Sequence, residues 1–160
     1  MKEKENLSIA QVVKKYNLNP NKSLGQNFIF DKSLLNKIAS LSDPKGVEVI
    51  LEIGPGPGGL TRALIENGAN KIYLIEQDIR FKGPIDEIIN DYPNKIIVRY
   101  EDALKFNYLN QFSKNVVITS NLPFNIATPL LINWLSVDPW PGWWSRMILM
   151  FQKEVAERIV

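Results

Sequence analysis

The chain has 160 residues, of which 45% are hydrophobic and 22% charged, and its formal net charge is +2 at neutral pH. This size and composition predict one globular domain with its own hydrophobic core. The sequence contains no cysteine and no histidine, which excludes disulfides, thiolate zinc sites, a cysteine nucleophile and a histidine base. No apolar run approaches the roughly 18 residues of a membrane span, and no signal-peptide pattern is present. We therefore expect a cytoplasmic protein without membrane or metal partners.

Positive charge gathers in the amino-terminal part of the chain. The first 45 residues carry eight lysines and four acidic residues. A face bearing these lysines would suit a nucleic-acid backbone, but an ordinary solvated surface explains the same charges equally well. Residues 1–6 are charged, and we expect them to be frayed.

Two helices are predicted before the first strand. Apolar residues at helical spacing indicate a short amphipathic helix over Leu7–Tyr16, and a polar loop, NLNPNKSLGQNFIFD, follows it. Asp31 is suited to cap a second helix, which the Asp43–Gly46 turn ends. The apolar face of this second helix contains Leu34, Leu35, Ile38 and Leu41.

From Val49 onward, apolar strands alternate with helical patterns. This alternation predicts right-handed crossovers and a parallel sheet with helices on both faces, the α/β class. The expected strands are Val49–Ile53, Lys71–Glu76, Lys95–Arg99, Asn115–Ser120 and Arg146–Phe151. Helices are expected from Leu60 to a stop at Gly68, over about Pro84–Asp91, over Asn125–Leu135, and from Gln152 onward.

The turn after the first strand reads GPGPGG. Its glycines Gly54, Gly56 and Gly59 match the GxGxxG spacing of dinucleotide-binding proteins. Such sites need backbone N–H donors aimed at a pyrophosphate, and Pro55 and Pro57 have none. The turn therefore favours a ligand without phosphate and disfavours a nicotinamide dehydrogenase. The structural alternative is a plain tight connection from strand to helix.

Three acidic residues, Glu52, Glu76 and Asp102, lie at or just after the ends of predicted strands. In a parallel sheet the carboxyl ends of the strands meet at one edge, where ligands bind. Carboxylates grouped there would repel phosphate and favour a cationic ligand with hydroxyl groups. S-adenosylmethionine has a sulfonium cation, a ribose diol and no phosphate, and it fits these requirements.

The segment Asn121-Leu122-Pro123-Phe124 follows the fourth predicted strand. The Asn121 side-chain oxygen and a backbone carbonyl near Leu122 or Pro123 could accept both hydrogens of an adenine amine, which would turn its lone pair toward an incoming methyl group. Phe124 offers a face for stacking a base that has been flipped out. The structural alternative is that Asn121 caps the next helix and Phe124 belongs to the core.

Four stretches carry a resemblance to a known family: LEIGPGPGGLT, the acid in LIEQD, EDALKF and NLPFNIATPLL. They resemble the ribosomal RNA adenine N6-dimethyltransferases, and most of all the small-subunit dimethyladenosine transferases. SLGQNFIFD and FQKEVAERIV resemble further motifs of that family, so the resemblance covers the chain from Asn19 onward. It implies a Rossmann-like methyltransferase fold and S-adenosylmethionine as the methyl donor. The implied reaction is dimethylation of adenine N6 in the ribosomal RNA of the small-subunit precursor, a step in ribosome biogenesis.

The resemblance also implies roles for single residues. Gly54 lies against the methionine portion of the cofactor, Glu76 holds the ribose hydroxyls and Asp102 accepts from the cofactor's adenine amine. The residues assigned to the cofactor are Asn27, Ile29, Gly54, Gly56, Glu76, Asp102 and Asn121, with residues 1–45 forming an extension that contributes to the cofactor rim.

The resemblance assigns the target amine to Asn121 and the target pocket to Leu122, Pro123 and Phe124. Many relatives have tyrosine at the position of Phe124. Stacking survives this difference, whereas a hydroxyl contact is lost.

The family continues past the position of Val160 with further strands and a small helical domain that helps to grip RNA. The methyltransferase domain over residues 1–160 is therefore expected to be incomplete at its carboxyl end, with an exposed sheet edge at Arg146–Phe151 and bare apolar surface. We expect weak stability or association of this shortened chain, and a monomer for the intact enzyme. A nearby aromatic cluster, Trp140, Trp143 and Trp144, is interpreted as packing over the core rather than as an RNA-stacking platform.

Two other functions stay open on the sequence alone. One is a non-catalytic relative that binds RNA or cofactor, although such a protein need not retain Glu76, Asp102 and the N-L-P-F segment. The other is a large-subunit rRNA adenine methyltransferase of the antibiotic-resistance type.

Overall fold

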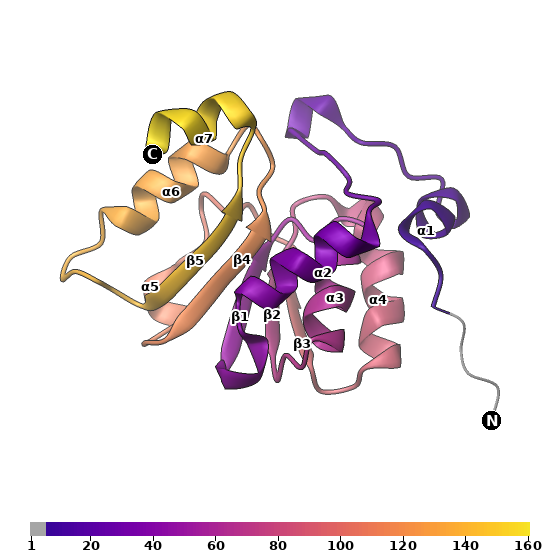
Figure 1. The fold of residues 1–160 in the computed structure, drawn as a ribbon, viewed down its shortest axis with the longest axis horizontal. Helices are drawn as coiled ribbons and strands as arrows, with labels where there is room; N and C mark the ends of the chain where they lie inside the picture. Colours follow the sequence, from indigo (N-terminus) through magenta and orange to yellow (C-terminus); the bar gives the residue numbers. More distant parts are fainter. Residues whose placement is uncertain (1–5) are drawn as a thin grey trace.

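A five-stranded parallel sheet forms the centre of the molecule, and its strand order is β3-β2-β1-β4-β5 (Figure 1). The computed structural model describes residues 6–160, so the frayed end predicted for residues 1–6 lies outside it except for Asn6. The strands are β1 (Val49–Ile53), β2 (Ile72–Ile75), β3 (Ile96–Arg99), β4 (Val116–Asn121) and β5 (Trp144–Met150). Every pairing is parallel, which confirms the predicted sheet.

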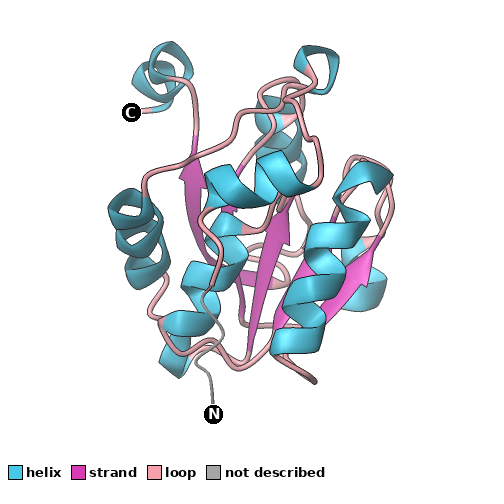
Figure 2. Cartoon of the chain, turned by 90° about the vertical axis from the view of Figure 1, so that its right-hand side faces the viewer, coloured by secondary structure: helices cyan, strands magenta, loops and turns pink. Residues whose placement is uncertain are grey.

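Helices cover both faces of this sheet (Figure 2). The helices are α1 (Ile9–Lys15), α2 (Lys32–Leu41), α3 (Gly59–Glu66), α4 (Lys82–Asp91), α5 (Tyr108–Gln111), α6 (Ala127–Leu135) and α7 (Lys153–Ile159). Residues 6–160 also contain three single turns of 3₁₀-helix, η1 (Lys22–Leu24), η2 (Pro44–Gly46) and η3 (Ile79–Phe81).

Two helix boundaries show how the sequence signals operate. Asp31 caps α2 as predicted, since its carboxylate accepts the Ser33 and Leu34 N–H groups at 2.8 and 3.2 Å. Helix α4 begins at Lys82, two residues earlier than predicted, so Pro84 is its third residue rather than its first. The first-turn N–H groups of a helix have no intrahelical partner, so proline loses nothing at this position.

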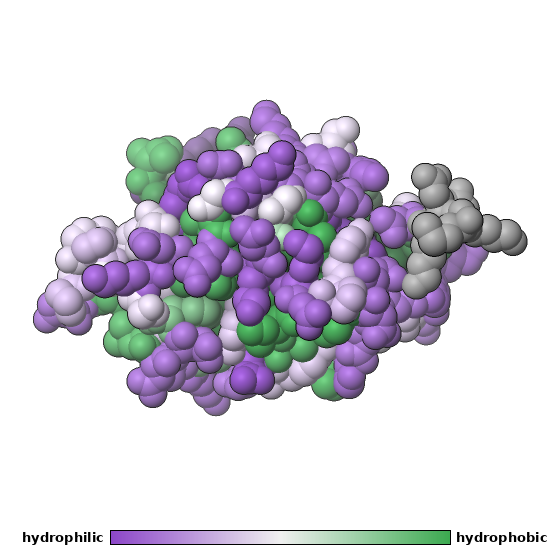
Figure 3. All heavy atoms as spheres, turned by 90° about the horizontal axis from the view of Figure 1, so that it is seen from below, coloured by the Kyte–Doolittle hydropathy of each residue, from purple (hydrophilic) through white to green (hydrophobic). Residues whose placement is uncertain are grey.

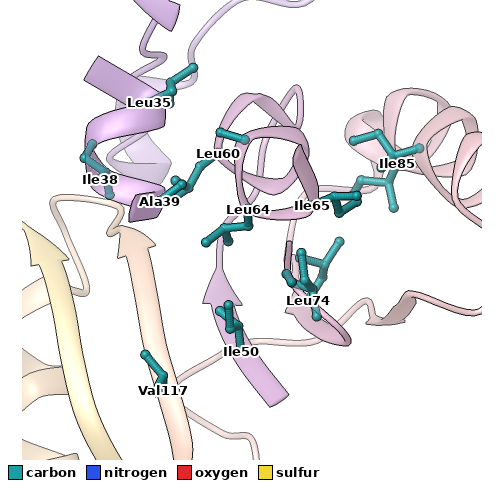
Figure 4. Close-up of a cluster of buried hydrophobic side chains, with 14 of the residues drawn as sticks. Leu35, Ile38, Ala39, Ile50, Leu60, Leu64, Ile65, Leu74, Ile85 and Val117 are labelled. Atoms are coloured by element: carbon teal, nitrogen blue, oxygen red, sulfur yellow. The ribbon is translucent and has the colours of Figure 1, made fainter. Parts of the chain in front are cut away.

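Alternate residues of the central strands supply the two halves of the core. Ile50 of β1, Leu74 of β2 and Val117 of β4 face α2, α3 and α4 (Figure 4). Their neighbours Leu51 and Ile118 face the opposite side, where they pack with α6 and the aromatic residues around α5. The period-2 pattern of a strand buried on both faces produces this arrangement.

Strand β5 lies at one edge of the sheet and pairs only with β4 within residues 6–160. Figure 3 shows a largely hydrophilic face of the molecule that is interrupted by apolar patches. Among the residues that the structure describes, the large apolar side chains with more than half of their surface exposed are Phe30, Leu41, Ile79, Leu109, Ile132, Trp140, Ile159 and Val160. None of the helices in the described part of the chain is long and apolar enough to cross a membrane.

Candidate functional site

A pocket lies at the carboxyl ends of β1, β2 and β4, and it encloses about 840 Å³ including the solvent at its mouth. The pocket is apolar for the most part, with a few polar groups, which is the usual character of a small-molecule site. Of the predicted site residues, those that line the pocket are Asn27, Ile29, Gly54, Gly56, Glu76, Asn121 and Pro123.

The turn after β1 forms the floor of this pocket. Gly54 and Gly56 have φ angles of +65° and +55°, which side-chain-bearing residues rarely adopt. A Cβ on Gly54 would lie 3.0 Å from Cγ of Pro123, and a Cβ on Gly56 would lie 3.7 Å from the ring of Phe28. Glycine at Gly54 therefore allows the turn after β1 to approach the loop after β4 closely.

Glu76 presents a buried carboxyl group beside this turn. Its Oε2 accepts the Gly56 N–H at 3.1 Å and its Oε1 accepts the Asp78 N–H at 2.8 Å. Burial raises the pKa of Glu76 to about 7, although these backbone donors favour the charged form. Each oxygen retains a lone pair, so the group is able to accept two hydroxyl groups of a ligand.

Glu52 also lines the pocket, but it is only 2% exposed and accepts the Thr61 hydroxyl at 2.7 Å. Burial raises the pKa of Glu52 to about 8. Glu52 is therefore mostly protonated at neutral pH, and the prediction that three acids give the crevice its negative charge is wrong for this residue.

Asp102 is not among the residues that line the pocket. Its Oδ1 accepts the Leu104 N–H at 2.9 Å, within its own loop, while its neighbours Glu101 and Ala103 line the pocket. A short acidic side chain readily bonds to the backbone two residues ahead, and this local bond sets its direction.

The segment after β4 does not serve as a helix cap. The Asn121 Nδ2 donates to the Asn27 carbonyl at 3.0 Å, and α6 begins after Ile126 without any side-chain cap. Phe124 is 37% exposed, whereas Leu122 is 1% exposed and packs in the core. The structural alternative of a capping Asn121 and a core Phe124 is therefore wrong. Because a carbonyl only accepts, the Asn121 nitrogen faces Asn27 and Oδ1 points elsewhere.

Several residues that sequence reasoning did not single out also belong to the site. The ring of Phe28 lines the pocket and meets that of Phe81 edge-on at 5.7 Å. Gln26 lines the pocket and donates to Asp78, which is paired with Arg80. No local pattern signals the Gln26–Asp78 contact, because 52 residues separate these side chains.

The predicted aromatic cluster divides into buried and exposed members. Trp143 is 2% exposed and stacks on Tyr108 and Phe112, with ring centroids 5.1 and 5.3 Å apart. The Trp144 indole N–H donates to the Trp134 carbonyl at 2.9 Å. Core packing is thus confirmed for Trp143, while Trp140 is 58% exposed.

Over residues 6–160, no group of three or more acidic side chains is placed to hold a metal ion.

Comparison with known proteins agrees with this geometry. The family model described as ribosomal RNA adenine dimethylase matches residues 17–160. A ribosomal RNA small subunit methyltransferase A from Rhodopseudomonas palustris is 48% identical over 153 residues, which cover 95% of this chain and 54% of that protein. The protein of the same name from Afipia carboxidovorans is 47% identical over the same shares. The chain thus spans about half the length of the curated relatives it matches.

Two solved structures are similar in fold as well as in sequence. A dimethyladenosine transferase from Plasmodium falciparum is 33% identical, with a TM-score of 0.67 over 81% of this chain and 44% of that one. The 23S rRNA methyltransferase ErmE is 25% identical, with a TM-score of 0.67 over 82% of this chain and 50% of that one. Since the family match extends over most of the sequence, the chain belongs to the ribosomal RNA adenine dimethylase family.

Proposed function

We propose that this chain transfers methyl groups from S-adenosylmethionine to the N6 amine of adenine in small-subunit ribosomal RNA. The observation that carries the proposal is the pocket between Glu76 and Asn121, built on a turn whose prolines cannot donate to phosphate. The small-subunit relatives at 47–48% identity favour this target over large-subunit RNA.

The residues at the site fit S-adenosylmethionine. Glu76 keeps acceptor capacity for two ribose hydroxyls, and Gly54 and Gly56 line the pocket beside it without side chains of their own. Asn27 and Ile29 border the pocket from the amino-terminal extension. We assign the second carboxylate oxygen of Asp102 to the adenine amine, because its Oδ1 is engaged by Leu104.

The proposed chemistry needs little acid–base help. S-adenosylmethionine supplies an electrophilic methyl group on a sulfonium centre. Asn121 Oδ1 and a carbonyl near Pro123 orient the target amine, while exposed Phe124 stacks on the base. The main contribution of the protein is to hold amine and methyl group in line. The amine's proton leaves to solvent after transfer, which suits a sequence without histidine.

Calorimetric titration with S-adenosylmethionine tests the cofactor site. We expect saturable binding by the chain, and binding at least about tenfold weaker for Glu76→Ala, because hydrogen bonds to a charged group are lost. Glu48→Ala is the matched control, since this exposed glutamate lies just before β1, at the opposite end of the strand. Glu48→Ala should bind as the wild type does.

A methylation assay separates the remaining alternatives. Small-subunit particles and deproteinised large-subunit RNA, both lacking the methyl groups, are incubated with labelled cofactor and the chain. Label in small-subunit RNA alone is the expected result, and label in large-subunit RNA alone would support the antibiotic-resistance type of activity. Cofactor binding without transfer to either RNA would support the non-catalytic alternative.

A further inference from the structure

The segment Asn21–Ile29, here called the strap, runs between α1 and α2 and above the sheet in Figure 1. It is a compact unit closed on itself. The Asn21 N–H donates to Gln26 Oε1 at 2.8 Å, and the Gln26 N–H donates to the Asn21 carbonyl at 3.2 Å. The single turn η1 lies between them, and the Asn21 side chain caps it.

One side of the strap is fixed to the loop after β2. Gln26 Nε2 donates to Asp78 Oδ2 at 2.7 Å, and Arg80 Nη2 donates to Gln26 Oε1 at 3.2 Å. The Arg80 guanidinium beside Asp78 also holds the pKa of that carboxyl below its usual range, so the pair stays charged. The Asp78 N–H in turn donates to Glu76, so the strap is linked to the proposed cofactor carboxylate through a single residue.

The other side of the strap is fixed to the loop after β4. The Phe124 N–H donates to the Gly25 carbonyl at 3.0 Å, and Asn121 Nδ2 donates to the Asn27 carbonyl at 3.0 Å. Gly25 has a φ of +64°, and a Cβ there would lie 2.6 Å from the Asn125 nitrogen and 2.7 Å from that of Phe124. No side chain fits between the strap and this loop.

Two adjacent residues, Gly25 and Gln26, thus contact opposite walls of the pocket. Strand β1 lies between β2 and β4 in the sheet, so the strap bridges the end of β1. We infer that the strap couples the cofactor side of the pocket to the target-base side, with Gly25 and Gln26 as positioning residues. It fixes the direction of the Asn121 amide and the backbone at Phe124. This inference rests on the proposed function for its effect on catalysis, but the coupling itself does not.

Amide hydrogen exchange followed by NMR on the 18.3 kDa chain tests the coupling without any ligand. The Phe124 N–H should be protected in the wild type. Gln26→Ala should raise its exchange rate at least about tenfold, although the Gln26 side chain bonds to Asp78 and Arg80 rather than to Phe124. Gln111→Ala is the matched control, since its side chain bonds to Tyr73 away from the pocket, and it should leave Phe124 unchanged. Unchanged Phe124 exchange in Gln26→Ala would overturn the inference.

Gly25→Ala tests the effect on catalysis. A displaced target loop should lower kcat by about 10²-fold, the scale of a misplacement of about 1 Å, and this loss should exceed any loss of affinity for S-adenosylmethionine. Gly68→Ala carries similar backbone strain, with φ +98°, but its Cβ would meet only the flexible Lys45 side chain. It should keep the wild-type kcat, because nothing in the pocket has to move.

The outcomes of these experiments are distinguishable. A wild-type chain that neither binds cofactor nor methylates RNA would contradict the proposed function. The hydrogen-exchange measurement would still test the coupling through the strap, because it needs no ligand. If the wild type is active and Gly25→Ala keeps its kcat, only the inference about positioning fails. An equal loss of kcat in Gly25→Ala and Gly68→Ala would assign the effect to general destabilisation and overturn the positioning role.

Discussion

The charge in the pocket depends on single side chains, and the pKa values of Glu52 and Glu76 are raised to different extents. Glu52 has one hydroxyl donor and is fully enclosed, so desolvation dominates its pKa. Glu76 has two backbone donors and is less enclosed, which keeps its pKa nearer the ordinary range. Near neutral pH Glu76 is therefore the more readily ionised of the two carboxyl groups.

Stability should fall as pH rises because of Glu52. Below about pH 4.5 both the folded and the unfolded chain hold its proton, so it adds no pH dependence. Between that pH and about pH 8 only the unfolded chain releases the proton. The free energy of unfolding then falls by up to about 1.4 kcal/mol per pH unit. Thermal melts from pH 5 to pH 8 should show a shallower fall for Glu52→Gln, which keeps an acceptor for Thr61. Equal slopes would mean that Glu52 is ionised in the folded chain.

Residue identity was easier to predict than side-chain direction. The strand-end positions of Glu76 and Asn121 followed from the alternation of strands and helices, and both residues line the pocket. Asp102 lies at a strand end too, yet its carboxylate bonds to the Leu104 N–H. Whether such a carboxylate bonds to a nearby backbone N–H or faces the pocket depends on the conformation of its loop. A pattern of residue types along the sequence does not contain that conformation.

At the scale of elements, regular helices and strands were predictable and the strap was not. Helix α2 has an apolar face and an acidic cap within a few residues of each other, so its signals are local. The strap has short-range closure, but its position depends on Asp78 and Phe124, which are far away in sequence. The spacing of apolar residues along the chain does not predict such contacts. The position of the strap could therefore not be predicted, even though several of its residues line the pocket.

The cap of α2 should contribute measurably to stability. Asp31→Ala leaves the Ser33 and Leu34 N–H groups without their acceptor, which costs about 1 kcal/mol. In a chain of this size the melting temperature should drop by roughly 2–4 °C. Asp31→Asn retains a capping oxygen and should melt within about 1 °C of the wild type. A drop of the same size for Asn would show that the charge, not the hydrogen bond, stabilises the helix.

For the molecule as a whole, the two halves of the core differ in composition. The half against α2, α3 and α4 is mostly aliphatic, whereas the other half contains stacked aromatic rings around Trp143. The sequence predicted helices on both faces because strands and helices alternate along the chain. It did not predict which tryptophan would fill the aromatic half, since three lie within five residues.

Chemical denaturation should separate the buried tryptophan from the exposed one. Trp143→Ala should lower the free energy of unfolding by about 3–5 kcal/mol, because it empties a buried site that contacts two stacked rings. Trp140→Ala should cost no more than about 1.5 kcal/mol, since this side chain is 58% exposed and its ring meets only that of Trp144 edge-on among the ring contacts of residues 6–160. Similar losses in the two variants would contradict the core role of Trp143.

The order of strands in the sheet also bears on how the site comes into being. Strands β1 and β4 are neighbours, although β2 and β3 come between them in the chain. The pocket has one wall after β2 and the other after β4, so it is complete only once this long loop has closed, a slow kind of step in folding. A partly folded chain in which β1 and β4 have not yet paired therefore has no complete pocket for a ligand. Any ligand of the pocket therefore binds only chains in which the sheet is complete. Its binding energy stabilises the pairing of all the strands that form the pocket, and not only one part of the sheet.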